Sequence, residues 1–157
     1  MLRWDGANSR VALLKDSLYV PVGLAAGIAT LDCLAQPGTY ERLEELGQVF
    51  DSSLADSLRE FRGAGTDDER PLRWRRVGSL LWLHLSSGEL PRAAGKIDPA
   101  AVGRYAPLHR ELLDGGQYLA PSAHEVAFLS TAHSPEEVCA LARAIARHAT
   151  IQDPQPA

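Results

Sequence analysis

This 157-residue chain contains five histidines, two cysteines and two lysines, and their spacing argues against metal binding and Schiff-base chemistry. His124 and His133 lie nine residues apart, flanking an expected strand, and the two-residue period of a strand predicts that they point to opposite faces. Neither has a cysteine or aspartate at ligand spacing, so we predict no metal site. His84 lies in a run of apolar residues and is expected to be a half-buried strand residue. The Gly-x-Ser-x-Gly motif of a hydrolase nucleophile is absent from the sequence.

Two lysines, Lys15 and Lys96, are the only candidates for Schiff-base chemistry. A Schiff-base lysine must be desolvated or lie near other positive charge to be nucleophilic at neutral pH. Lys15 lies in a weakly specified N-terminal region and Lys96 in an expected loop, so we expect water around both. The sequence also contains neither of the glycine-rich motifs Gly-x-Gly-x-x-Gly and Gly-x-x-x-x-Gly-Lys-Ser/Thr that bind phosphates.

Composition and charge narrow the class of protein further. Hydrophobic residues make up 45% of the chain and charged residues 23%, which fits a single small globular domain. A net charge of −4 argues against nucleic acid or an anionic membrane as a partner. The apolar run 20–28 is too short to cross a bilayer and the first residues do not resemble a signal peptide, so we expect a cytoplasmic protein. Cys33 and Cys139 fall at apolar positions of expected helices, where we interpret them as reduced packing residues.

Helices are expected in four segments. Residues 21–35 are apolar almost all round, which predicts a helix buried between two layers. Thr39 is the expected N-cap of an amphipathic helix that reaches residue 61. Residues 98–114 and 134–148 carry N-terminal capping signals and, in the first case, a Gly-Gly stop.

Strands are expected in two regions. Residues 72–87 predict two strands or one broken strand, with a bend at Gly78-Ser79. Residues 118–122 and the segment ending at His133 predict two further strands. The Trp74-Arg75-Arg76 cluster could contact an anion or a partner, or form a cation–π pair on the sheet edge. Together these elements predict an α+β fold, in which helices pack on one face of a small, mainly antiparallel sheet.

Four segments resemble the C-terminal small domain of glutamate-1-semialdehyde 2,1-aminomutase, a class III aminotransferase that uses pyridoxal phosphate. They are Pro-Val-Gly-Leu-Ala-Ala-Gly-Ile-Ala-Thr-Leu at 21–31, Pro-Gly-Thr-Tyr-Glu-Arg-Leu at 37–43, Arg-Val-Gly-Ser-Leu at 76–80, and Tyr-Leu-Ala-Pro-Ser at 118–122 with Glu125 and Phe-Leu-Ser-Thr-Ala-His at 128–133. Many class III aminotransferases share the first two segments, so the aminomutase assignment depends mainly on the last. The resemblance implies the fold of the small C-terminal domain of fold-type I aminotransferases. It also implies a division into a divergent segment 1–20, an aminotransferase-like small domain 21–149 and a flexible tail 150–157.

The resemblance also indicates what the chain lacks. In the family, a Thr-x-Ser-Gly-Asn-Pro-like loop before the first helix reaches the cofactor phosphate of the neighbouring subunit. Only Pro21 of that loop matches residues 16–21 here, so we assign no cofactor-binding residue. The family's large domain, with its cofactor lysine, has no counterpart in the sequence. We therefore expect no pyridoxal phosphate on this chain alone and no activity in isolation.

Glu125 is the catalytic residue that the resemblance implies. In the family, this glutamate points to the substrate side of the active site, where a carboxylate can bind an amino group or tune proton transfer. The alternative is a carboxylate that protects an exposed sheet edge. Ser122 is a candidate substrate-binding residue, with the alternative role of capping a turn that places Glu125.

Two hypotheses of function remain open. The first is an aminomutase small domain, either a gene fragment or one piece of a split enzyme. The resemblance then implies that it takes part in forming 5-aminolevulinate for tetrapyrrole synthesis only with a separate large domain or subunit. The second is a non-catalytic interaction module that kept the fold. The apolar helix at 21–35 discriminates between them: the resemblance implies that the large domain and the partner subunit cover it in a complete enzyme, whereas alone it would leave an exposed apolar face. We expect the isolated chain to self-associate through this helix, most simply as a homodimer.

Overall fold

The computed structural model describes residues 21–62, 72–86 and 89–151. The chain divides into two units, residues 1–39 and 40–157, and each is described by itself. The predictions for segment 1–20, for Lys15 and for the tail beyond Ile151 lie outside the described residues.

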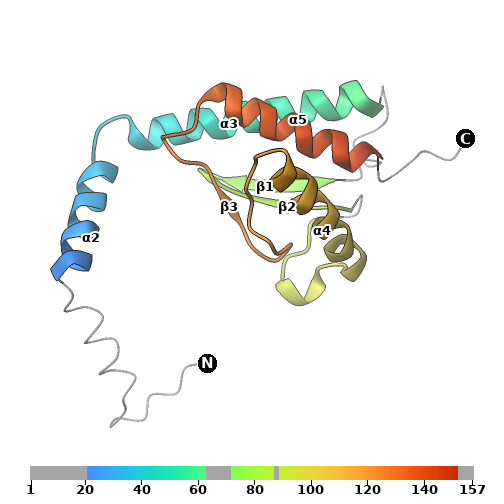
Figure 1. The fold of residues 1–157 in the computed structure, drawn as a ribbon, viewed down its shortest axis with the longest axis horizontal. Coiled ribbons are helices and arrows are strands. Elements are labelled where there is room, and N and C mark those ends of the chain that lie inside the picture. Colours follow the sequence, from blue (N-terminus) through green and yellow to red (C-terminus); the bar gives the residue numbers. More distant parts are fainter. Residues whose placement is uncertain (1–20, 63–71, 87–88, 152–157) are drawn as a thin grey trace, which may run out of the picture. The chain divides into compact units, whose positions relative to one another are not determined.

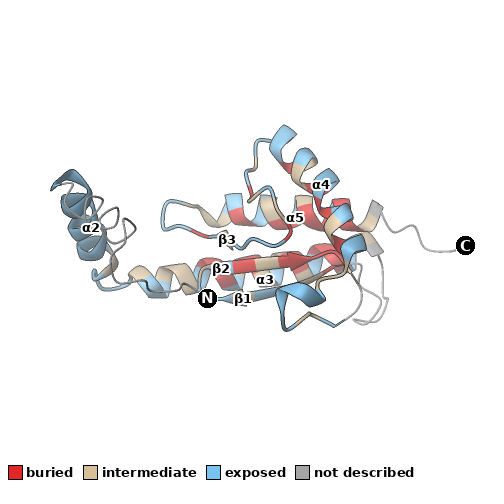
Figure 2. Ribbon diagram, turned by 90° about the horizontal axis from the view of Figure 1, so that it is seen from below, coloured by how far each residue is buried: buried red, intermediate tan, exposed pale blue. Residues whose placement is uncertain are grey.

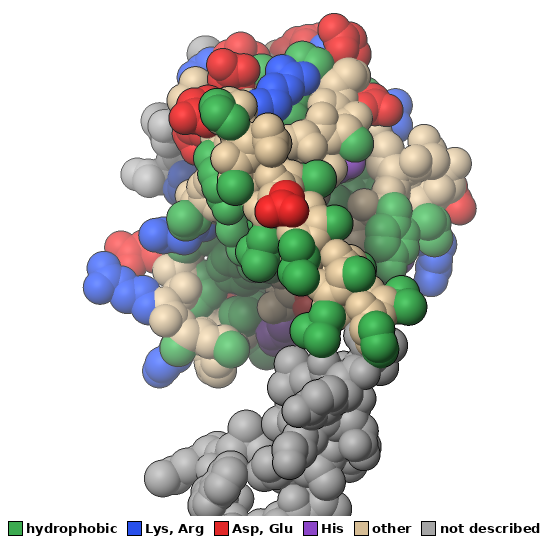
Figure 3. All heavy atoms as spheres, turned by 90° about the vertical axis from the view of Figure 1, so that its left-hand side faces the viewer, with side chains coloured by type: hydrophobic (Ala, Val, Ile, Leu, Met, Phe, Trp, Pro, Cys, Tyr) green, Lys and Arg blue, Asp and Glu red, His purple; other side chains and the backbone are tan. Residues whose placement is uncertain are grey.

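The first unit contains helix α2, Pro21–Leu34. Proline opens the helix, where its missing N–H costs no hydrogen bond, and Gly38, with a φ of 88°, lies in the turn that follows. Hydrophobic side chains gather along α2 (Figure 3). No residue of α2 is buried, and Cys33 is exposed. The predicted burial of this helix and the packing role of Cys33 are therefore wrong in this structure, because no second layer covers α2 among the described residues of its own unit.

Helix α3, Thr39–Arg62, opens the second structured region and follows the amphipathic pattern. Leu46, Phe50, Leu54 and Leu58 recur every four residues and are all buried. This spacing places one apolar stripe along the helix. Thr39 is not the predicted N-cap: it is the first residue of α3, and its hydroxyl donates to the carbonyl of Cys33.

Strands β1, Arg73–Val77, and β2, Leu80–His84, form an antiparallel hairpin. Its two-residue turn needs a positive φ, which Gly78 supplies at 57°. Strand β3, Ala127–Phe128, pairs antiparallel with β2, and the strand order is β1-β2-β3. The predicted bend at Gly78-Ser79 is thus a hairpin turn between two strands.

The prediction of a strand at 118–122 is wrong, and of the segment that leads to His133 only Ala127–Phe128 is a strand. Three backbone carbonyls of the first segment and its continuation, those of Leu119, Ala120 and Ala123, accept hydrogen bonds from side chains. These carbonyls are thus engaged by a histidine, a tyrosine and a tryptophan, where a strand would pair them with a neighbouring backbone.

Helices α4, Pro99–Asp114, and α5, Pro135–Ile151, follow the predicted signals closely. Asp98 caps α4 by accepting from the backbone N–H of Ala100, and α4 ends at Gly115. Ser134 and Glu137 form a reciprocal capping box at the start of α5. A short 3-10 helix, η2, spans Ala94–Lys96 before α4.

The layers of the second unit confirm the α+β prediction. Helices α3 and α5 lie side by side over the sheet, and α4 packs on α5 (Figure 1). Buried residues lie along β2 and along the helices, whereas α2 is exposed (Figure 2). Leu81 and Leu83 of β2 join α3, α4 and α5 in one core, which also contains Leu108 and Ile145.

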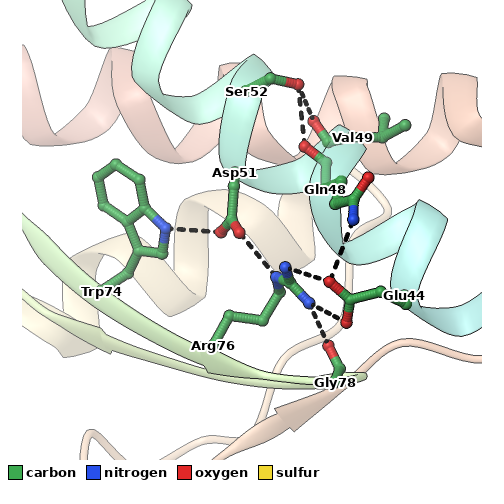
Figure 4. Close-up of polar contacts among 8 residues, drawn as sticks. All are labelled: Glu44, Gln48, Val49, Asp51, Ser52, Trp74, Arg76 and Gly78. Atoms are coloured by element: carbon green, nitrogen blue, oxygen red, sulfur yellow. Dashed lines mark hydrogen bonds and ion pairs between the residues drawn. The ribbon is translucent and has the colours of Figure 1, made fainter.

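One polar cluster fastens β1 to α3 (Figure 4). The Arg76 guanidinium donates to both carboxylate oxygens of Glu44, to Asp51 and to the carbonyl of Gly78. The Trp74 indole donates to the other oxygen of Asp51, at 2.8 Å. The bond to Arg76 lowers the pKa of Glu44. Trp74 and Arg76 therefore share a carboxylate, a different arrangement from the predicted cation–π pair or anion contact.

Among the described residues, no helix has the length and apolar character needed to cross a membrane.

Cys139 is exposed on α5, with its sulfur 3.1 Å from the Ser53 hydroxyl, so the predicted packing role of Cys139 is also wrong. Its neighbours along the helix, Val138 and Ala142, are the residues that enter the core.

Candidate functional site

The segment between α4 and β3, residues 117–126, presents Glu125 at the surface. Glu125 is exposed, and it lines a hollow together with Tyr118, His124 and Phe128. The residue lies in a bend two residues before β3, so it is not the edge-strand carboxylate of the alternative prediction. An exposed carboxylate in a hollow can accept a hydrogen bond from a cationic amine.

Three side chains hold the backbone of this segment in place. The Tyr105 hydroxyl of α4 donates to the carbonyl of Ala120 at 2.7 Å, and the Trp82 indole of β2 donates to that of Ala123 at 2.8 Å. His109 Nε2 lies 3.2 Å from the carbonyl oxygen of Leu119. We call these three side chains the carbonyl clamp. They fix the segment on both sides of Pro121.

The clamp residues also stack on one another and on their neighbours. His109 lies between Tyr105 and Tyr118, with ring centroids 6.4 Å and 6.2 Å away. Trp82 stacks on His84, which is buried rather than half-buried as predicted. Burial lowers the pKa of His84. These contacts add apolar packing to the hydrogen bonds that hold the segment.

Ser122 shapes the turn that leads to Glu125. Its hydroxyl accepts from the backbone N–H of His124 at 3.2 Å, and its carbonyl accepts from that of Glu125 at 3.1 Å. This is the turn-capping geometry that we gave as the alternative to substrate binding. Ser122 therefore places Glu125 through the backbone.

The electrostatics connect Glu125 with the clamp. Burial raises the pKa of Tyr105, and the negative charge of Glu125 raises it further. The phenol therefore stays protonated well into the alkaline range and keeps donating to Ala120.

A second hollow lies between β3 and the first turns of α5, and it includes His133 and Glu137. Their polar atoms are engaged locally: His133 Nδ1 accepts from the N–H of Ser130, and Glu137 accepts from that of Ser134. Neither His124 nor His133 belongs to a group of three or more potential metal ligands in the described part of the chain. We assign no acid–base pair to this hollow.

The described residues do not fit a pyridoxal phosphate site. Lys96 is exposed in η2, where nothing desolvates its amine, and Lys15 lies outside the described residues. A Schiff-base lysine needs a dry or positively charged setting. We therefore derive no reaction step through the cofactor on this chain.

Glu125 and Ser122 stay predictions as site residues, and the carbonyl clamp was not predicted from the sequence. The buried side of α4 includes Tyr105. His109 follows it by one helical turn, and this spacing is the signal that could have paired them. The Trp82 contact could not be read from spacing, because its partner lies 41 residues away.

The chain is similar to proteins of the aminotransferase class. It is 38% identical over 129 residues to a glutamate-1-semialdehyde 2,1-aminomutase of Pelotomaculum thermopropionicum, a match that covers 82% of this chain. A crystal structure of an omega-transaminase from Sphaerobacter thermophilus superposes with a TM-score of 0.64 and 28% identity over 85% of this chain. The chain spans only 28% of the length of either protein. No protein-family model matches the chain.

These similarities confirm the resemblance predicted from the sequence. The similarity to the transaminase structure agrees with the α+β fold of this chain, in which helices pack on a small antiparallel sheet. The two similarities extend over most of this chain and over a minor part of each relative, so they identify the chain as a partial aminotransferase-like unit.

Proposed function

We propose that this chain is the C-terminal small domain of a glutamate-1-semialdehyde 2,1-aminomutase-like enzyme and acts only together with the domain that carries the cofactor lysine. The observation that carries the proposal is the 38% identity over 82% of this chain, confined to 28% of the relative. The reaction would convert glutamate-1-semialdehyde to 5-aminolevulinate with pyridoxal phosphate bound elsewhere, and another class III aminotransferase substrate is the nearest alternative. The cytoplasmic location and the absence of nucleic-acid and membrane partners stay predictions.

Glu125 is the residue of this chain that we place nearest the chemistry. The hollow at Glu125 is open, and the clamp fixes the backbone before it. A carboxylate held in this way can orient a substrate amino group and stabilise its charge. Ser122 supports that carboxylate by shaping the turn.

The proposal is tested in a fused protein, in which the full chain replaces the matched segment of the Pelotomaculum aminomutase. We expect the fused protein to form 5-aminolevulinate, whereas the same aminomutase without the segment does not. Glu125→Gln should lower kcat about tenfold or more, because the substituted amide no longer carries the charge that orients the amine. A fused protein that binds cofactor and folds but has no aminomutase activity would contradict the aminomutase assignment.

We predict that the isolated chain does not bind pyridoxal phosphate, since Lys96 is exposed and the phosphate loop of the family is not matched. Absorbance in the aldimine band after incubation and desalting checks this. The Lys96→Arg variant is the control. A stoichiometric adduct that borohydride reduces, and that Lys96→Arg or Lys15→Arg abolishes, would overturn the prediction.

The second candidate function is a non-catalytic interaction module. It is favoured by one observation: the 14 residues of α2 include none that is buried. An apolar helix without a cover is a common feature of association surfaces. Formation of 5-aminolevulinate by the fused protein distinguishes the two candidate functions, because only the first predicts this activity.

A further inference from the structure

Three apolar side chains form a row across one face of the sheet. The register pairs Val77 with Leu80 and Leu80 with Phe128. Directly paired residues of antiparallel strands point to the same face. Their exposed fractions are 69%, 41% and 64%. Leu81, the next residue of β2, points the other way and is buried in the core.

Two more exposed apolar residues extend this row. Tyr118 and Val126 are 75% and 38% exposed, and they line the same hollow as Phe128. We name Val77, Leu80, Tyr118, Val126 and Phe128 the apolar sheet patch. A soluble domain rarely exposes so many large apolar side chains next to one another unless they meet a partner. Aromatic residues are also enriched in the cores of protein interfaces.

The backbone that carries the apolar sheet patch is ordered by hydrogen bonds within the chain. Leu80 and Phe128 are fixed by strand pairing, with the N–H of Leu129 bonded to the carbonyl of Ser79 at 2.8 Å. His109 fixes Tyr118 by edge contact, and the clamp holds the chain that follows. A surface whose backbone is already ordered loses little conformational entropy when it binds.

The charges near the patch restrict the partner. Glu125 lines the hollow beside Tyr118 and Phe128, and it is exposed. Arg75 is also exposed and lies two residues before Val77, on the same face of β1. A complementary surface therefore combines an apolar area with a cationic group opposite Glu125 and an acidic group opposite Arg75. A purely acidic or purely polar surface would leave both the apolar side chains and this carboxylate without suitable contacts.

We propose that the apolar sheet patch is the surface on which the cofactor-bearing part of an aminotransferase-like protein docks. This rests on the proposed function. The occupant follows from the extent of the match: the chain spans 28% of the aminomutase and 28% of the transaminase, so most of each protein lies outside it. The part of each relative that has no match in this chain is the occupant to which we assign the patch.

Thiol labelling measures whether the patch is covered. Both native cysteines are exposed and are first replaced by serine. Leu80→Cys and Phe128→Cys then report on the patch, and Leu113→Cys, on α4 and 49% exposed, is the matched apolar control. Maleimide reaction is followed in the isolated chain and in the fused Pelotomaculum protein described above.

We expect labelling at both patch positions to be about tenfold or more slower in the fused protein, because the thiol must then wait for local opening. Labelling at the control position should be unchanged. Equal rates at the patch positions in a fused protein that forms 5-aminolevulinate would overturn the docking surface and leave the proposed function intact. Slower labelling at the patch positions in a fused protein that forms no 5-aminolevulinate would support the docking surface and contradict the proposed function.

A fused protein that does not fold is replaced by a mixture of the isolated chain and the aminomutase that lacks its matched segment. Slower labelling of Phe128→Cys in that mixture supports the docking surface, and an unchanged rate overturns it. Labelling of the isolated chain at increasing concentration is the remaining control. Protection that depends only on the chain's own concentration would assign the patch to a second copy and overturn the proposal.

Discussion

Arg76 determines how closely α3 approaches the sheet. Its guanidinium is bonded to Glu44, Asp51 and Gly78, and its side chain is only 12% exposed. The helix carries Gly47 where it passes this group. A Cβ at position 47 would lie 2.5 Å from Arg76 Nη1 and 2.8 Å from its Cδ and Cζ. Glycine is therefore required here for close approach, although it weakens a helix.

Gly47→Ala is expected to destabilise the chain by about 1–3 kcal/mol, because the added methyl must displace a bonded guanidinium. Gly103→Ala, in α4, has open space around its Cβ and should stabilise by about 0.5–1 kcal/mol through helix propensity. Urea unfolding followed by circular dichroism measures both. In an Arg76→Ala background, Gly47→Ala should become stabilising. A penalty that persists there would show that the close contact with Arg76 is not its cause.

Glu111 joins α4 to α5 through His148 and Arg147. The bond from His148 is the largest cause of a lowered Glu111 pKa, and partial desolvation opposes it. A carboxyl with a lowered folded pKa contributes stability above its unfolded value of about 4.3, and this contribution is lost as pH falls through the folded pKa. The His148 side chain is buried, whereas that of Glu111 is 40% exposed, so the contribution is screened by solvent.

Glu111→Gln should therefore destabilise the chain near neutral pH by no more than about 1 kcal/mol. The difference from the parent should shrink as pH falls below about 4, where the parent carboxyl is protonated as well. Unfolding midpoints across that pH range check the slope. His148→Phe should remove the same pH-dependent difference. A difference that is constant with pH would assign Glu111 a packing role.

At the scale of elements, the helices could be predicted from sequence better than the region of the site. The predicted caps Ser134 and Asp98 are local signals, and the structure confirms both. The segment 117–126 could not be predicted, because Tyr-Leu-Ala-Pro-Ser has strand-like composition while its conformation depends on side chains from α4 and β2. The same limit applies to Cys139, whose exposure depends on which face of α5 meets the core.

Tyr105→Phe tests whether the clamp controls the segment that carries Glu125. Loss of the bond to Ala120 leaves a part-buried carbonyl without that donor and should cost about 1–2 kcal/mol. The amide of Glu125, bonded to Ser122, is the local reporter. Its hydrogen exchange should accelerate in Tyr105→Phe and not in Tyr118→Phe, where the tyrosine is 75% exposed. Unchanged exchange in both variants would show that the segment is ordered without the clamp.

At the scale of the whole molecule, two apolar surfaces belong to different units. The apolar sheet patch lies in residues 40–157, and α2 lies in residues 1–39. We assign the patch to the cofactor-bearing part. The association surface of the isolated chain is assigned to α2, whose Val22, Leu24, Ile28 and Leu31 are each at least 50% exposed. The two assignments make separable predictions, because substitution in one surface leaves the other unchanged.

The isolated chain is expected to self-associate through α2, most simply as a dimer. Burial of a few hundred Å² of apolar surface, at roughly 25 cal/mol per Å², would contribute several kcal/mol to association. Light scattering at high micromolar concentration measures the mass, and Leu24→Glu or Ile28→Glu should return it to that of a monomer. Phe128→Glu, in the sheet patch, is the control and should leave the dimer intact. A parent chain that is monomeric at that concentration would remove the support that α2 gives to the interaction-module hypothesis, because an exposed apolar helix that does not associate is not a docking surface.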